Sequence, residues 1–345
     1  MKRVFACLLL LVLLSTCLWG CGAQSKPKEK TVFSYFDTFT TVSSFAGDSD
    51  VSFEENCEAV LSLLAHYHRL FDIYNAYEDT PNLYTVNQMA GVAPVTVDPL
   101  LIDFLLYAKE IFTLTSGETN IALGAVLSLW HDCRTEAESA PDAARLPDES
   151  ALTAAALHTD IEKLVIDKEA GTVFLADEKM SLDVGALGKG YAVEKAAELL
   201  KQRNATGYVV NVGGNLRTVG TKPSGDGWVT GIKNPDPLAE DYLARLTLSD
   251  GALVTSGSYE RYYTVAGVNY HHVIDPDTLY PATYFLSVTV LCSDSGLADA
   301  LSTALFCMSY EEGLALLSSL PNTEALWVTV AGEIKMTEGM KDKML

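Results

Sequence analysis

The sequence predicts an α+β protein, because helical periodicity dominates its first half and β-rich runs alternate with helices in its second half. In residues 51–74, apolar and aromatic side chains recur at the spacing of one helix face. Asp98-Pro99 opens a second amphipathic helix, since proline suits the first helical position. With 345 residues, of which 48% are hydrophobic, the chain can bury a large core as one domain or two closely joined lobes.

In the second half, the β-rich runs are separated by turn residues and by amphipathic stretches that predict helices. The predicted strands are 208–212, 286–292 and 325–330, and the predicted helices are 191–201 and 296–308. The most polar and irregular stretch, 130–157, is expected to form a surface excursion with a short helix.

The N-terminus indicates export. Lys2 and Arg3 precede an apolar run over residues 4–20 that is short for a membrane span and typical of a signal peptide, here assigned to residues 1–20. A small residue before Cys21 matches a bacterial lipoprotein signal, so we expect Cys21 to be lipidated; Cys17 ends a competing match. Residues 21–31 read as a flexible tether. We therefore expect an extracytoplasmic protein that is lipid-anchored to a bacterial membrane, on the outer face of the cytoplasmic membrane.

The net charge and the cysteines exclude several classes of protein. A formal charge of −21 opposes binding to nucleic acid, so any phosphate ligand must be held by local groups. Beyond the tether, the cysteines form no CxxC pair and no His/Cys cluster at zinc spacing, which argues against a zinc site. Cys57, Cys292 and Cys307 lie in apolar runs and are expected in the core; the disulfide state stays open.

Residues 182–191, Leu-Asp-Val-Gly-Ala-Leu-Gly-Lys-Gly-Tyr, predict a strand that breaks into a glycine-rich turn and then a helix. Glycines let backbone N–H groups approach phosphate oxygens, the helix N-terminus adds positive potential, and Lys189 adds a full charge. The spacing differs from a P-loop and Gly190 stands where Ser or Thr is required, so nucleotide triphosphatases are excluded. A purely structural corner remains the alternative to an anion site.

Asp299 and Thr303 lie four residues apart on a predicted helix and therefore share a face. A carboxylate and a hydroxyl are hard oxygen donors, and Mg²⁺ takes one or two such groups together with water and phosphate. The pattern is compatible with a Mg²⁺ site. It is equally compatible with Asp299 favouring the helix dipole and Thr303 bonding back to a carbonyl of its own helix.

His271 and His272 lie next to a predicted turn at residues 275–278. Neighbouring residues of a strand point to opposite faces, so at most one of the two histidines faces a given site. A histidine with its ordinary pKa near 6.5 could accept a proton from an attacking hydroxyl. The alternative is a surface hairpin without catalytic function.

In this order along the chain, the motifs resemble the ApbE family of FAD:protein FMN transferases, which includes flavin-trafficking lipoproteins. The resemblance spans about residues 32–332, within a predicted domain over 32–345. It implies a T-fold-related, two-lobed single catalytic unit with FAD between the lobes. The segments that carry it are 71–75, 116–121, 182–191, 211–215, 255–261, 272–276 and 298–303.

The resemblance also implies roles for individual residues. Asp183 and Lys189 would contact FAD, and His272 would assist the nucleophile. The Mg²⁺ ligands would be the Ala186 carbonyl, Asp299 and Thr303, with Asp299 also catalytic. The remaining pocket residues would be Tyr74, Glu118, Thr119, Asn120 and Ile274. The chain departs from the family pattern at Glu118, Thr119 and Asn120, and at Leu279, where glycine is usual.

The implied reaction is Mg²⁺-dependent transfer of FMN from FAD to a Ser or Thr hydroxyl of an acceptor protein, with release of AMP. This chain has no Ser/Thr-Gly-Ala-Ser/Thr segment, so self-modification is not expected. The resemblance implies a separate acceptor protein of extracytoplasmic electron transfer. Two alternatives remain: a Mg²⁺-dependent FAD pyrophosphatase that yields FMN and AMP, and a flavin-binding lipoprotein without catalysis.

Overall fold

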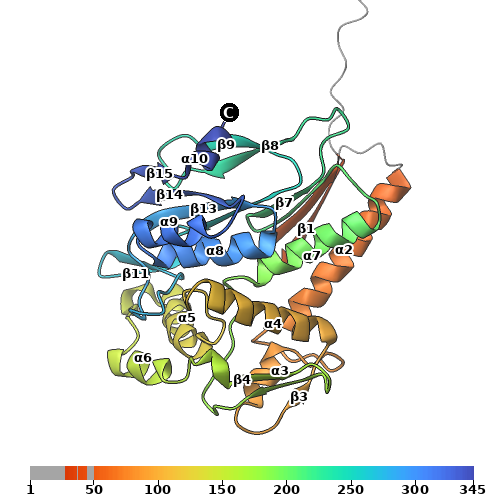
Figure 1. Ribbon diagram of the computed structural model, residues 1–345. Helices are drawn as coiled ribbons and strands as arrows, with labels where there is room; N and C mark the ends of the chain where they lie inside the picture. Colours follow the sequence, from red (N-terminus) through yellow and green to blue (C-terminus); the bar gives the residue numbers. More distant parts are fainter. Residues whose placement is uncertain (1–27, 37, 45–49) are drawn as a thin grey trace, which may run out of the picture.

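The computed structural model describes residues 28–36, 38–44 and 50–345. Its centre is an eight-stranded sheet in the order β1-β2-β6-β7-β10-β13-β14-β15, in which every neighbouring pair is antiparallel (Figure 1). Its strands are β1 (Lys28–Tyr35), β2 (Thr38–Ser44), β6 (Tyr208–Val212), β7 (Asn215–Val219), β10 (Ala252–Gly257), β13 (Phe285–Cys292), β14 (Glu324–Thr329) and β15 (Ile334–Met336).

Three smaller sheets surround this one and supply parts of the site. They have the orders β3-β5-β4, β8-β9 and β11-β12. Their strands are β3 (Val95–Thr96), β4 (Leu164–Asp167), β5 (Thr172–Leu175), β8 (Trp228–Lys233), β9 (Tyr242–Leu248), β11 (Tyr262–Val265) and β12 (Val268–His271).

The helices begin where the sequence provides capping groups. Asp98 accepts a hydrogen bond from the Leu100 N–H at 2.8 Å and starts α4, and Asp294 does the same for α8 through the Leu297 N–H at 2.8 Å. The helices are α2 (Asp50–Phe71), α3 (Leu83–Gln88), α4 (Pro99–Leu114), α5 (Gly124–Ser139), α6 (Glu149–Ala156), α7 (Gly188–Gln202), α8 (Ser295–Cys307), α9 (Tyr310–Ser318) and α10 (Glu338–Asp342), with short 3-10 turns at Pro141–Ala143 and Ile161–Lys163.

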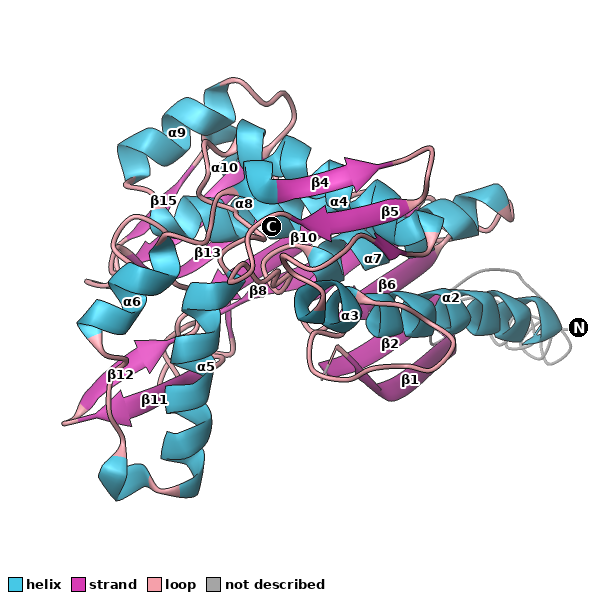
Figure 2. Cartoon of the chain, turned by 90° about the horizontal axis from the view of Figure 1, so that it is seen from below, coloured by secondary structure: helices cyan, strands magenta, loops and turns pink. Residues whose placement is uncertain are grey.

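Helices α7 and α8 lie side by side on one face of the large sheet, α7 over β6 and β7 and α8 over β10 and β13 (Figure 1). Helix α2 packs against α7 and β1, and α5, α6 and β11 gather at one side of the molecule (Figure 2). One apolar core joins α2, α4 and α7 to β6, and a second joins α8 to β10, β13 and β14. The α7–α8 pair therefore connects the two cores.

The predicted α+β class is confirmed, as are the predicted helices and the strands at 208–212, 286–292 and 325–330. Three predictions need correction. The strand predicted at the start of residues 182–191 does not form, since only Ser181 makes an isolated bridge there, with Leu123. The tether predicted for residues 21–31 extends too far along the chain, because residues 28–31 pair with β2 as part of β1. The stretch 130–157 is an excursion only in part: residues 138–143 are exposed and the short helix is α6, but residues 130–139 belong to the 16-residue helix α5. Trp130 of α5 is buried because its indole packs between tyrosines. The signal peptide and Cys21 lie outside the described residues.

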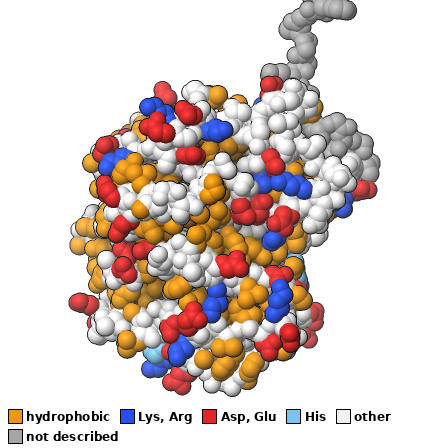
Figure 3. Space-filling view, in the orientation of Figure 1, with side chains coloured by type: hydrophobic (Ala, Val, Ile, Leu, Met, Phe, Trp, Pro, Cys, Tyr) orange, Lys and Arg blue, Asp and Glu red, His pale blue; other side chains and the backbone are white. Residues whose placement is uncertain are grey.

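Cys57, Cys133, Cys292 and Cys307 are buried free thiols, so the core placement is confirmed for the three predicted cysteines. Within the described residues, no helix combines the length and apolar character needed to cross a bilayer. On the face shown in Figure 3, Lys and Arg side chains are interspersed with Asp and Glu, without one continuous positive field.

Candidate functional site

A cavity of about 1140 Å³ lies between the helical elements and the large sheet. This volume is above the usual range of about 300–1,000 Å³ for small-molecule pockets, which suits a large ligand. Ten predicted site residues line it: Tyr74, Glu118, Asn120, Asp183, Ala186, Lys189, His272, Ile274, Asp299 and Thr303. Residues from distant parts of the sequence therefore meet at one cavity.

The glycine-rich turn forms one wall of the cavity and leads into α7. The Asp183 carboxylate accepts the Gly185 N–H at 2.8 Å, and Lys189 Nζ donates to the Gly185 carbonyl at 3.2 Å. Within the described residues, the N-cap residue Leu187 makes no side-chain cap, but the first-turn N–H groups of Gly188 and Gly190 are bonded, to the Val184 carbonyl at 2.8 Å and to the Asp299 carboxylate at 2.8 Å. The positive end of the helix dipole still lies at this wall. Together with the Lys189 charge, this arrangement suits a phosphate group.

Asp299 and Thr303 meet the turn from α8. The Thr303 hydroxyl lies 3.5 Å from the Ala186 carbonyl oxygen, and Asp299 Oδ2 accepts the Gly190 N–H at 2.8 Å. Asp299 is only 5% exposed, and burial raises its pKa, an effect that Lys189 and the Gly190 N–H oppose. Among the described residues, no ion pair includes Asp299, so a cation beside it would favour the ionised form.

These oxygens fit a magnesium ion. Within the described part of the chain, no group of three His, Cys, Asp or Glu side chains could hold a metal, so any metal must use carbonyl and hydroxyl ligands as well. Two ligands about 2.1 Å from one Mg²⁺ lie at most about 4.2 Å apart, and the Ala186 and Thr303 oxygens satisfy this limit. One carboxylate, one carbonyl and one hydroxyl leave octahedral positions for water and phosphate oxygens.

The two histidines after β11 point in different directions, as predicted. His271 packs on Phe306, whereas His272 lines the cavity and its Nδ1 lies 3.2 Å from the Arg261 carbonyl oxygen. A carbonyl only accepts, so Nδ1 carries the hydrogen and Nε2 keeps a lone pair. The expected ordinary pKa was wrong: burial, followed by the charges of Arg261 and Lys189, lowers the pKa of His272 to about 3.

The three residues that depart from the family pattern behave differently. Glu118 lines the cavity, its Oε2 is buried without a hydrogen-bond partner in the described structure, and burial followed by Asp277 and Asp275 raises its pKa to about 7. Asn120 lines the cavity and donates to the Thr159 carbonyl at 3.0 Å.

Thr119 does not line the cavity, in contrast to the prediction. It is 1% exposed, and its hydroxyl donates to the Ala300 carbonyl of α8 at 2.8 Å. The turn after α4 presents Glu118 and Asn120 to the cavity, whereas the Thr119 N–H donates to the Thr115 hydroxyl at 3.1 Å and its side chain points into the protein. Its contact ties this turn to α8 behind the site.

Tyr74 stands at the rim of the cavity, 57% exposed, with its ring centroid 5.2 Å from that of His131. Its loop is held by Asp72, which accepts the Tyr74 N–H at 2.7 Å, and by Asn82, whose amide donates to the Asn75 carbonyl at 2.8 Å. Ile274, 5% exposed, forms part of the opposite wall.

Sequence reasoning missed His131 and Arg134, which line the cavity from α5. Arg134 donates to His131 Nδ1 at 3.1 Å, which places a cation near the rim. The signal was present, because Leu127, Trp130, His131 and Arg134 follow helical spacing, but the polar composition was interpreted as an excursion.

Leu279 occupies the position where the family pattern has glycine, and the turn keeps the conformation that glycine would allow. Its φ is 64°, in the left-handed region. The Leu279 carbonyl accepts the Trp130 indole N–H at 2.9 Å, and Asp275 accepts the N–H groups of Asp277 and Thr278 as predicted for this turn. Leu279 therefore holds this turn at a positive φ that glycine adopts more readily.

Fold and site together bring a glycine-rich turn, a lysine and three oxygen ligands to one large cavity, an arrangement that could hold a phosphate group and a hard cation. The ApbE family model matches residues 36–327, and the chain belongs to this family. A relative from Klebsiella pneumoniae named FAD:protein FMN transferase is 33% identical over 76% of this chain and 81% of its own length, and one of the same name from Treponema pallidum is 33% identical over 79% and 77%.

Solved structures agree with this assignment. An ApbE protein from Thermotoga maritima superimposes with a TM-score of 0.81 at 29% identity, over 93% of this chain and 100% of its own. The flavinyl transferase ApbE from Pseudomonas stutzeri has the same fold, with a TM-score of 0.74 at 23% identity over 93% and 99%. The predicted family and its fold are thereby confirmed.

Proposed function

We propose that this protein is a Mg²⁺-dependent FAD:protein FMN transferase that attaches FMN to a Ser or Thr hydroxyl of an acceptor protein and releases AMP. The observation that carries the proposal is the convergence of Lys189, the α7 N-terminus and the Ala186, Asp299 and Thr303 oxygens at one cavity. The names of the curated relatives supply the substrates, FAD and a protein.

The pyrophosphate of FAD would lie against the glycine-rich turn. Lys189 and the positive end of the α7 dipole would offset its charge, and the large volume of the cavity would accommodate the rest of the dinucleotide. When bound between Ala186, Asp299 and Thr303, Mg²⁺ supplies Lewis-acid polarisation of the phosphate oxygens.

The chain's own groups then move the proton. The acceptor hydroxyl oxygen bonds to the FMN phosphorus, the bond from that phosphorus to the AMP phosphate oxygen breaks, and the hydroxyl proton passes to His272 Nε2. The Arg261 carbonyl holds His272 in the tautomer that can accept it. An anionic pyrophosphate beside Lys189 and Arg261 offsets the charges that lower the pKa of His272, which makes the ring a better base in the complex.

For the location we propose a lipid anchor at Cys21, with residues 22–27 as the tether and the catalytic domain outside the cytoplasm. The support is the sequence alone: a basic pair, an apolar run and a small residue directly before the cysteine. The proposed acceptor is an extracytoplasmic electron-transfer protein that the tethered enzyme can reach.

The test is to incubate the purified protein with FAD, Mg²⁺ and an acceptor domain that carries a Ser/Thr-Gly-Ala-Thr segment, and to follow acceptor mass and AMP. We expect the acceptor to gain the mass of FMN minus one water, with one AMP released for each FMN attached. The Asp299→Ala variant should show neither the mass gain nor the AMP release. AMP and free FMN without acceptor labelling would instead identify an FAD pyrophosphatase, and tight FAD binding without AMP would identify a flavin carrier.

A further inference from the structure

The contact between α7 and α8 follows a regular pattern that extends beyond the candidate metal site. The two helices run antiparallel, and contacts between them recur every four residues from the cavity inward. These contacts are Ala186 O with Thr303 Oγ1 at 3.5 Å, Gly190 N with Asp299 Oδ2 at 2.8 Å, and Ser295 N with Glu194 Oε2 at 2.8 Å. These three contacts form one continuous interface between the helices, called the α7–α8 seam below. The candidate metal-binding oxygens lie at one end of this interface and Glu194 lies at the other.

The two inner contacts are reciprocal. Gly190 lies in the first turn of α7 and Ser295 in the first turn of α8, where backbone N–H groups lack acceptors within their own helix. Asp299 of α8 accepts the first N–H, and Glu194 of α7 accepts the second. Each helix thus supplies the carboxylate that completes the start of the other, which determines how far α8 can slide along α7.

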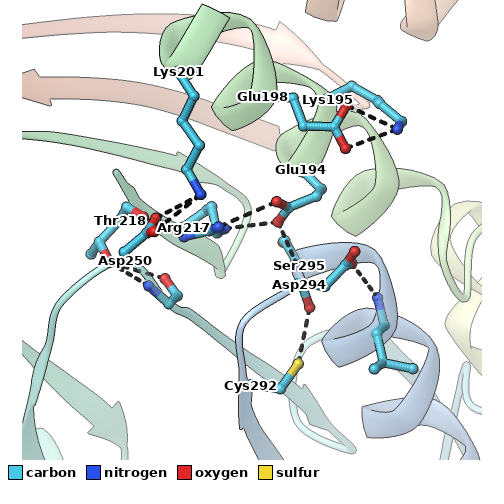
Figure 4. A network of polar contacts seen from close by, with 12 residues as sticks. Glu194, Lys195, Glu198, Lys201, Arg217, Thr218, Asp250, Cys292, Asp294 and Ser295 are labelled. Atoms are coloured by element: carbon cyan, nitrogen blue, oxygen red, sulfur yellow. Dashed lines mark hydrogen bonds and ion pairs between the residues drawn. The ribbon is translucent and has the colours of Figure 1, made fainter. Parts of the chain in front are cut away.

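Arg217 of β7 holds the Glu194 carboxylate in place (Figure 4). Its Nε donates to Glu194 Oε2 at 2.8 Å and its Nη2 to Oε1 at 3.3 Å, while Nη1 donates to Asp250 Oδ1 at 3.1 Å. Arg217 is 2% exposed, and its Nη1 also donates to the Thr218 carbonyl. With both oxygens bound, Glu194 cannot turn away from the Ser295 N–H.

We propose that Glu194, held by Arg217, is a positioning residue that sets the separation of the Ala186 and Thr303 oxygens and thereby the affinity of the site for Mg²⁺; this inference rests on the proposed function. Ser295 and Thr303 are about 12 Å apart along α8, so a tilt of about 5° at Ser295 moves Thr303 by about 1 Å. Mg²⁺ requires near-ideal octahedral geometry, so a shift of this size weakens binding.

The experiment uses the full-length Glu194→Gln variant, which keeps an acceptor for Ser295 but loses the charge. The first readout is the Mg²⁺ concentration that gives half-maximal change in FAD binding, followed by flavin fluorescence; we expect it to rise about 10- to 100-fold. The second is the amide exchange rate of Gly190 in the metal-free protein, which we expect to rise about tenfold because its bond to Asp299 loosens.

Two controls separate positioning from general stability. Glu198→Gln alters a half-buried pair with Lys195 on the next turn of α7, away from Ser295, and should change neither readout. Leu301→Val trims a buried side chain of α8 and should lower the unfolding temperature without changing the Mg²⁺ requirement. Arg217→Lys keeps the charge but loses the two-bond contact, so it should shift both readouts in the same direction as Glu194→Gln.

Unchanged Gly190 exchange in Glu194→Gln, or an equal Mg²⁺ shift in Leu301→Val, would overturn the inference. If FAD binding by the wild-type protein proves independent of Mg²⁺, the metal role in the proposed function fails instead. Gly190 exchange, which needs no metal, then decides by itself whether Glu194 positions α8.

Discussion

Replacing Gly190 by alanine tests the tightness of the α7–α8 seam most directly. A Cβ at this position would lie 2.3 Å from the Asp299 Cβ and 2.3 Å from the Ser295 carbonyl oxygen. Ordinary contacts begin at 3.4 Å, and the carbonyl is backbone, so α8 must move by about 1 Å. Overpacking of this kind costs about 1–3 kcal/mol, and the helix propensity that alanine gains returns up to about 1 kcal/mol.

We therefore expect Gly190→Ala to lower the free energy of unfolding by about 1–2 kcal/mol and to raise the Mg²⁺ requirement for FAD binding at least tenfold. Urea unfolding and a fluorescence titration measure the two effects. The matched control is Gly313→Ala in α9, where the nearest atoms are side-chain atoms of Leu305 at 3.0 Å and Trp327 at 3.4 Å that can adjust. Wild-type stability together with a wild-type Mg²⁺ requirement in Gly190→Ala would refute the reasoning.

Three further predictions concern the cavity. Asp299→Asn keeps an acceptor for Gly190 but removes the charge, so FAD binding should lose its Mg²⁺ dependence in a fluorescence titration; a retained dependence would contradict the metal assignment. The pKa of Glu118 is about 7 in the folded protein and near 4.5 in the unfolded chain, so the folded state loses stability as the pH rises between these values. The free energy of unfolding of the protein should fall by about 1 kcal/mol over this range. Urea unfolding of Glu118→Gln should lack this fall. Asn82→Ala removes the amide that binds the Arg69 and Asn75 carbonyls, which should cost about 2–3 kcal/mol in urea unfolding and weaken FAD binding; a loss below about 0.5 kcal/mol would show that the loop holds without it.

Local patterns in the sequence predicted most of the elements, because they depend on neighbouring residues. Asp98-Pro99 marks the start of α4, and the alternation of apolar and turn residues marks β6, β13 and β14. The helix over residues 130–139 was not predicted, because the apolar face of α5 is narrow and its polar residues are many. The polar composition therefore concealed the helical periodicity.

The candidate site was predictable only in part. Lys189, Asp299 and Thr303 could be proposed from spacing, since a turn and a helix face are local features. The low pKa of His272 could not be proposed from the sequence, because it depends on burial in the folded protein and on the charges of Arg261 and Lys189, which act through space. The burial of Thr119 likewise depends on α8, which lies far along the chain.

The sequence by itself determined the fold class, the family and the residue types that can bind phosphate and a hard cation, because each is recorded in short, ordered motifs. The family resemblance already implied that Ala186 and Thr303 share one ion; only the tertiary structure decided that their oxygens lie 3.5 Å apart and that Glu194 accepts the Ser295 N–H. These pairs are separated by more than a hundred residues, and their contact arises from the packing of α7 on α8 over the sheet, which no local pattern encodes.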